Sequence, residues 1–89
     1  RGTAASFSRC SGSIRRIVRF KESKTYTFTL DCALTKGSMT IMFLDPDKKE
    51  VLRLSGDQSN MAVALERKKR YTLVVRFEAA TGRYGLRWE

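Results

Sequence analysis

The sequence predicts an all-β protein, an antiparallel β-sandwich or barrel of six to seven short strands. Apolar and polar residues alternate along most of the chain, as they do on strands with one buried face. Turns rich in Gly, Asp and Ser separate these segments at spacings of about a dozen residues, which is typical of sandwiches and barrels. Only one short segment, at 61–66, is also compatible with a helix.

The chain has 89 residues, which is enough for one small domain. We expect that domain to span 14–89, after a flexible tail or edge segment at 1–13. A domain of this size buries only about two-thirds of the surface of its unfolded chain. Little apolar material is therefore left for a deep active site, and we expect the protein not to be an enzyme.

The first predicted strand is "IRRIVRFK", at 14–21. In its period-two phase, Ile14, Val18 and Phe20 face inward. The opposite face carries a cationic stripe with one apolar member, namely Arg15, Ile17, Arg19 and Lys21. Arg16 falls on the inward side, which is tolerable where a strand lies at a sheet edge.

The clearest strand is "TYTFTLDCALT", at 25–35, in which Tyr26, Phe28 and Leu30 alternate with threonines. Gly37 then marks a turn at 35–38, and "MTIMFL" at 39–44 is the next strand. In "LDPDKKE", Asp45 caps a type I turn and Pro46 presets its second position, so a further strand follows at 50–55.

After a turn at 56–60, "MAVALE" at 61–66 alternates as a strand does, although its alanines and a cap at Asn60 would also suit a short helix. We predict a strand because every neighbouring segment is one. "YTLVVRF" at 71–77 and "YGLRW" at 84–88 complete the fold, joined by a turn at 78–83 that contains Gly82.

The chain contains no histidine and two cysteines, Cys10 and Cys32. It therefore cannot form a closed zinc site alone, nor a Ser–His or Cys–His catalytic pair, and we expect no cofactor. A Cys10–Cys32 disulfide is a candidate if the protein is exported. Asp45 and Asp47 supply too few oxygens for calcium, so we interpret them as turn-capping residues.

Two cationic groups are candidate sites in a chain whose net charge is +9. The stripe Arg15, Arg19 and Lys21 is the first, because period two would aim its side chains at one face and because residues 1–24 hold seven Lys or Arg against one acid. The weaker candidate is the loop cluster Arg67, Lys68, Lys69 and Arg70, which is also what an ordinary solvated hairpin tip looks like. Either would favour a polyanion.

Nearly all aromatic residues fall on predicted core faces, and these are Tyr26, Phe28, Phe43, Tyr71, Phe77, Tyr84 and Trp88. A nucleic-acid platform needs exposed aromatics for base stacking. The alternative function, an OB-like domain that binds nucleic acid through its basic N-terminal strand, therefore predicts a closed five-stranded barrel with two aromatics exposed beside Arg15 and Arg19.

The order of "TYTFTL", "MTIMFLDPDKKEVL" and "RYTLVVRFEAATGRYGLRW" resembles bacterial modules of the pre-peptidase C-terminal type, which are jelly-roll-like β-sandwiches. It is also similar to small uncharacterised domains of exported or lipid-anchored Gram-positive proteins. The resemblance covers about 24–88 and rests on Tyr26, Phe28, Leu30, Leu44, Asp45, Asp47, Tyr71, Ala80, Gly82, Tyr84, Leu86 and Trp88. The chain departs from the pattern at Lys48, where a glycine is usual, and at "KKRY".

The resemblance implies a jelly-roll-like sandwich that serves as a non-catalytic accessory or interaction module of an exported or cell-envelope protein. It also implies an extracellular or envelope location, with a signal or anchor upstream of Arg1. Given the charge, the expected partners are an anionic cell-wall polymer, a lipid surface or a protein. The ligand and the oligomeric state are open at this point.

Overall fold

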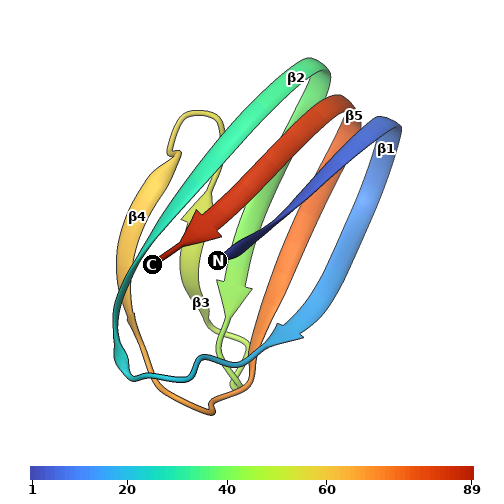
Figure 1. Cartoon of the computed structure of the whole chain (residues 1–89). Coiled ribbons are helices and arrows are strands. Elements are labelled where there is room, and N and C mark those ends of the chain that lie inside the picture. Colours follow the sequence, from blue (N-terminus) through green and yellow to red (C-terminus); the bar gives the residue numbers. More distant parts are fainter.

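The computed structural model describes all of residues 1–89, as five antiparallel strands and no helix (Figure 1). The strands are β1 (Gly2–Val18), β2 (Lys24–Leu44), β3 (Glu50–Leu54), β4 (Asn60–Leu65) and β5 (Tyr71–Trp88). Their order in the sheet is β1-β5-β2-β3, and β4 also pairs with β2. The segment at 61–66 is thus a strand, as predicted. No helix has the length and hydropathy that a bilayer crossing needs.

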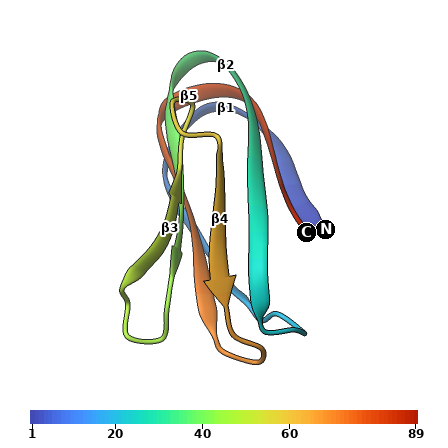
Figure 2. The same ribbon diagram turned by 90° about the vertical axis from the view of Figure 1, so that its left-hand side faces the viewer.

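The single sheet folds over onto itself because β1, β2 and β5 are long and bend in the middle. The first half of β2 pairs with β4 and with the second half of β5, whereas its second half pairs with β3 and with the first half of β5. β1 follows β5 through the same bend. Two stacked layers result (Figure 2), layer A containing β4 and layer B containing β3. The predicted antiparallel β-sandwich is confirmed.

The bends explain why there are five strands rather than the predicted six to seven. The turn signals at 35–38 and 78–83 are bends within continuous strands, where the pairing register shifts. Gly37 has a φ of +74°, and a Cβ there would collide with the carbonyl oxygens of Glu78 and Ala79 on the neighbouring strand. Glycine allows both the left-handed backbone and this close approach. Sequence alone does not distinguish such a bend from a hairpin.

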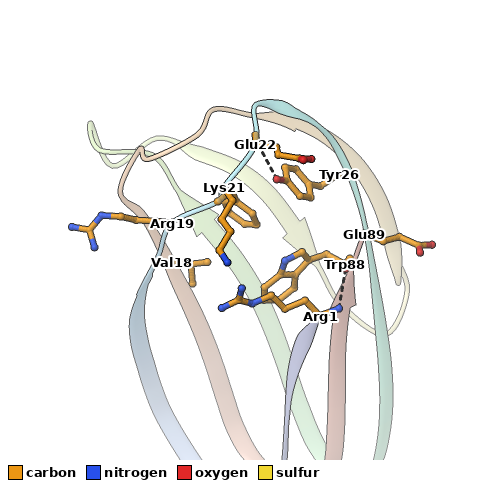
Figure 3. A pocket seen from close by; sticks show the side chains of 9 residues that line it. Arg1, Val18, Arg19, Lys21, Glu22, Tyr26, Trp88 and Glu89 are labelled. Atoms are coloured by element: carbon orange, nitrogen blue, oxygen red, sulfur yellow. Dashed lines mark hydrogen bonds between the residues drawn. The ribbon is translucent and has the colours of Figure 1, made fainter.

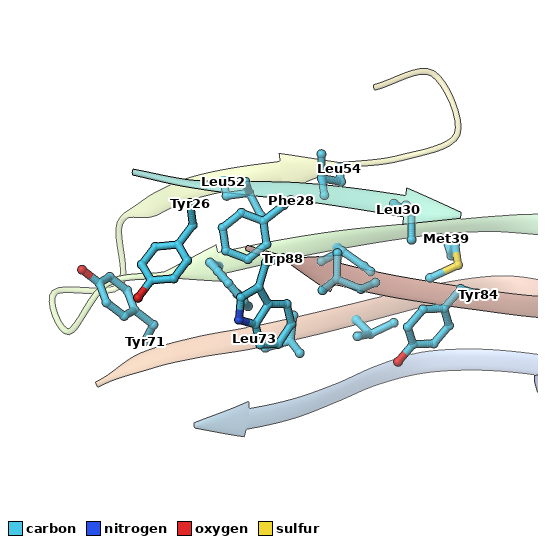
Figure 4. Packing of buried hydrophobic residues seen from close by; sticks show 14 of the residues in the cluster. Tyr26, Phe28, Leu30, Met39, Leu52, Leu54, Tyr71, Leu73, Tyr84 and Trp88 are labelled. Atoms are coloured by element: carbon cyan, nitrogen blue, oxygen red, sulfur yellow. The ribbon is translucent and has the colours of Figure 1, made fainter. Parts of the chain in front are cut away.

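The core lies between the layers and is rich in aromatic rings (Figure 4). Phe28 of layer A and Phe43 of layer B are fully buried, and their ring centroids are 5.1 Å apart with the planes at 87°. This edge-to-face arrangement is a favourable one for aromatic pairs. All seven aromatic residues assigned to the core from the sequence are buried.

Residues 2–13 belong to β1, at the edge of the sheet. They therefore form an edge segment, and the alternative expectation of a flexible tail is wrong. Their alternation is weak because an edge strand buries little of either face. Within β1, Phe7 does pack on the core, with its ring centroid 4.6 Å from that of Phe77.

The candidate disulfide is not formed, and Cys10 and Cys32 are both free thiols. Cys10 lies in β1 opposite Ala80, and Cys32 lies in β2 opposite Tyr84. Strand β5 separates the two cysteines, which puts them at least about 10 Å apart, at two strand spacings and with partners four residues apart on β5. A disulfide requires Cα atoms within about 7 Å. Partial burial raises the pKa of the Cys32 thiol.

Candidate functional site: a cationic end of the sandwich

Three segments meet at the same end of the sandwich, at the bottom of Figure 1. They are 19–24, from the end of β1 to the first residue of β2; 45–49, between β2 and β3; and 66–70, between β4 and β5. We call the surface that they form the cationic end. It carries nine Lys and Arg residues against four acids, and the nine are Arg19, Lys21, Lys24, Lys48, Lys49, Arg67, Lys68, Lys69 and Arg70.

The backbone of Phe20 joins the first of these segments to the third. Phe20 and Arg67 form a parallel β-bridge, in which the Lys68 N–H donates to the carbonyl oxygen of Phe20 at 2.9 Å. The Arg67 N–H donates to the hydroxyl of Ser23 at 2.8 Å. Two cationic stretches more than forty residues apart in sequence thereby become one surface.

The side chain of Phe20 anchors that contact in the core. Phe20 is 5% exposed, and its ring centroid lies 4.8 Å from that of Tyr26 and 5.9 Å from that of Trp88. It closes the space between the two layers at this end. The neighbouring Arg19 and Lys21 are both exposed.

The loop at 66–70 is held by the strand that follows it. The Glu66 N–H donates to the hydroxyl of the buried Tyr71 at 2.9 Å, and Lys68 adopts a left-handed φ of +63°. The Lys69 ammonium donates to the Glu66 carboxylate at 2.8 Å, which raises the pKa of Lys69. Arg67, Lys68 and Arg70 form none of the ion pairs of the chain, so their charge is available to a ligand.

The turn at 45–49 has the capping expected from its sequence. The Asp45 carboxylate accepts from the N–H groups of Asp47 at 2.8 Å and Lys49 at 2.9 Å, and the Asp45 carbonyl accepts from Lys48 at 2.9 Å. The charge of Asp45 also contributes weakly to the raised pKa of Lys69. The turn lies at the same end of the sandwich as the loop at 66–70 (Figure 1).

The predicted stripe of Arg15, Arg19 and Lys21 is wrong as a single face. β1 ends at Val18, so the period-two alternation does not reach Arg19 and Lys21. Arg15 lies instead on the outer face of layer B. It is paired with Val74, in a row that continues through Met42 to Arg53.

A pocket of about 380 Å³ opens beside the cationic end, between the ends of the two layers (Figure 3). Its apolar wall is formed by Val18, Phe20, Tyr26 and Trp88. The side chains of Lys21 and Arg1 point toward one another across this wall, whereas Arg19 points outward (Figure 3). The Tyr26 hydroxyl donates to the Glu22 carbonyl oxygen at 2.8 Å and fixes the far side.

The arrangement could not be found from local patterning, because its elements are distant in the sequence. The one local signal was Phe20, a large apolar residue between Arg19 and Lys21. The sequence placed it on a strand face, whereas it caps the core from a connecting segment.

The structural expectations of the OB-like alternative are wrong. The sheet is open, with β1 at one edge and β3 and β4 at the other. Phe20 and Trp88, which lie beside Arg19 in the pocket, are 5% and 8% exposed and cannot offer a stacking face to bases. The large apolar residues that are exposed are Ile14, Ile17 and Met61, and none is aromatic.

No protein-family model and no curated protein matches the chain. Among solved structures, PliG of Aeromonas hydrophila, a periplasmic lysozyme inhibitor of g-type lysozyme, superposes with a TM-score of 0.64 at 14% sequence identity. The match covers 100% of this chain and 85% of that one. At this identity the likeness shows a shared fold, so the whole chain adopts the sandwich architecture of that inhibitor.

Proposed function

We propose that the protein is a non-catalytic binding module of an exported bacterial protein, and that its cationic end binds a phosphate-bearing polyanion of the cell envelope. The ligand chemistry is a row of phosphates, on a cell-wall polymer or on lipid headgroups. The observation that carries the proposal is the joining of 19–24 to 66–70 through the Phe20–Arg67 bridge.

The form of the site favours an extended polyanion over a small anion. Arg67, Lys68 and Arg70 are exposed and project from a loop rather than into an enclosed cavity. Each cation that meets a phosphate releases a counterion, so affinity grows with the number of contacts and falls steeply with salt. Exposed Lys and Arg without aromatic partners recognise the charge of a ligand and not its bases.

The envelope location is supported by two independent resemblances. The pattern at 24–88 is similar to modules of exported proteins, and the whole chain shares its fold with a periplasmic inhibitor. That neighbour is an inhibitor rather than an enzyme, which agrees with a non-catalytic role here. The choice of a polyanion as the ligand class rests on the positive surface charge of this chain.

The proposal is tested by titration against three probes: poly(glycerol phosphate), vesicles rich in phosphatidylglycerol, and single-stranded RNA. The variant Arg67→Gln/Lys68→Gln/Arg70→Gln is expected to lose at least about tenfold in affinity for the polymer or the vesicles at low salt. The matched control Lys36→Gln/Arg76→Gln/Arg83→Gln removes the same charge from exposed positions outside the cationic end and should bind nearly as wild type.

The choice of probe distinguishes the two phosphate sources, since polymer binding without vesicle binding assigns the wall and the reverse assigns the membrane. Equal losses in the two triple variants would reduce the effect to net charge and overturn the site. Tighter binding to RNA than to either envelope probe would overturn the function in favour of the nucleic-acid alternative.

A further inference from the structure

The second half of β1 is a long, regular and unpaired sheet edge. Residues 12–18 pair with β5 without a break in register, from Gly12 opposite Phe77 to Val18 opposite Tyr71. β1 pairs with no other strand, so the backbone groups on its free side have no strand partner. The strands at the opposite edge, β3 and β4, have only 5 and 6 residues.

The side chains on this edge form an unusual pattern of apolar, cationic, cationic and apolar residues. Ile14 is 46% exposed and Ile17 is 49% exposed, and they are two of the three large apolar residues exposed anywhere on the chain. Arg15 and Arg16 lie between them and are also exposed. The ion pairs of the chain include neither arginine.

Pairing of this edge with a second copy of the chain is electrostatically disfavoured. In a two-fold antiparallel pair centred on Arg15 or on Arg16, that arginine would face the same arginine of the other copy. Like charges directly opposite one another destabilise a sheet, whereas opposite charges stabilise it. The same edge thus repels itself and attracts a strand that carries acids at the two central positions.

We propose that residues 13–18 are a docking site for an extended acidic segment of a protein partner, which adds to layer B as an antiparallel strand. Backbone hydrogen bonds to the free side of β1 would supply much of the affinity, and side chains would supply the specificity. The expected partner sequence is apolar, acidic, acidic and apolar, opposite Ile17, Arg16, Arg15 and Ile14 in turn. This site uses a different surface and a different ligand class from the cationic end.

The test uses a capped hexapeptide, Thr-Val-Glu-Glu-Val-Thr, titrated into the isotope-labelled protein. We expect chemical-shift changes and slowed amide exchange confined to residues 13–18 and their partners on β5. A second peptide has Lys in place of both Glu. A third has N-methylated valines, and because these two positions differ in parity, one methyl group faces β1 in either register.

The wild-type protein should bind the Glu peptide at least about tenfold more tightly than the Lys and N-methylated peptides. Arg15→Glu/Arg16→Glu should reverse the charge preference, and Arg15→Gln/Arg16→Gln should abolish it while leaving the backbone pairing. Lys36→Glu/Arg83→Glu, a control with the same charge change at exposed positions that are not paired with 13–18, should keep the wild-type preference.

Three results would overturn the proposal. One is equal binding of the Glu and Lys peptides by the wild-type protein. Another is undiminished binding of the N-methylated peptide, which would mean that no strand is added. The third is a stable dimer in sedimentation that protects the amides of 13–18 without any peptide. The triple variant of the loop at 66–70 should bind the Glu peptide normally, so failure here is separate from failure of the polyanion site.

Discussion

The backbone N–H of Lys68 donates a hydrogen bond of 2.9 Å to the carbonyl oxygen of Phe20. This bond links two connecting segments where two strand pairings end, β2–β4 at Lys24 opposite Leu65 and β1–β5 at Val18 opposite Tyr71. The first segment, at 19–24, is anchored in the core by the buried ring of Phe20. The second carries the cationic cluster at 67–70. The cationic end therefore depends on a buried aromatic side chain as much as on its charges.

Truncating Phe20 should destabilise the whole domain. Phe20→Ala removes a ring that packs against five other aromatic rings, and we expect a loss of about 3–5 kcal/mol in the free energy of unfolding. Ile17→Ala, at a position 49% exposed, should cost much less. Urea denaturation measures both. Equal losses in the two variants would show that Phe20 does not anchor the core.

The hydroxyl of Tyr71 should stabilise the loop at 66–70. Tyr71→Phe leaves the Glu66 N–H without its acceptor and should cost about 1 kcal/mol in unfolding free energy. Faster amide exchange at Glu66 should accompany the loss. The control is Tyr84→Phe, because the Tyr84 hydroxyl takes part in none of the hydrogen bonds of the protein and is not a buried unpaired group, so its removal exposes no partner. A Tyr71→Phe variant as stable as the wild type, with unchanged exchange at Glu66, would contradict this role.

The bend in β2 should not tolerate a side chain at Gly37. Gly37→Ala forces an alanine into a left-handed backbone and against the carbonyl oxygens of Glu78 and Ala79, so we expect a loss of more than about 1 kcal/mol. Gly56→Ala is the matched control, since a Cβ there meets open space and its φ is ordinary. Thermal denaturation should separate the two variants clearly. Equal melting temperatures of the Gly37→Ala and Gly56→Ala proteins would mean that β2 and β5 do not approach closely at the bend.

The two cysteines should react with alkylating reagents as two free thiols in the folded, non-reduced protein. Because burial raises the pKa of Cys32, less of it is thiolate at mildly alkaline pH, and iodoacetamide should modify it more slowly than an unshifted cysteine. The rate should increase as the pH is raised through that pKa. Mass spectrometry of the alkylated peptides measures both thiols. A mass lower by two hydrogens, with neither cysteine modified, would reveal a disulfide and require β1 and β2 to be rearranged.

The sequence predicts the faces of the strands well and their connections poorly. Alternation at 25–35 identifies Tyr26, Phe28 and Leu30 as core residues because each strand obeys its own period of two. Whether Gly37 reverses a chain or bends a strand depends on the neighbouring β5, which no local pattern contains. For the same reason the sequence presents the cations of the cationic end as two separate candidate sites. Phe20 and Arg67 meet only once the sandwich is closed.

Phosphate contact by the loop at 66–70 is tested most directly by the salt dependence of binding to poly(glycerol phosphate), measured for the wild type and for Arg67→Gln/Lys68→Gln/Arg70→Gln. If these residues contact phosphates, the slope of the logarithm of the affinity against that of salt concentration should become shallower by about 2–3 in the variant. Lys36→Gln/Arg76→Gln/Arg83→Gln should keep the wild-type slope. A slope unchanged by loss of the loop cations would mean that these residues do not contact phosphate.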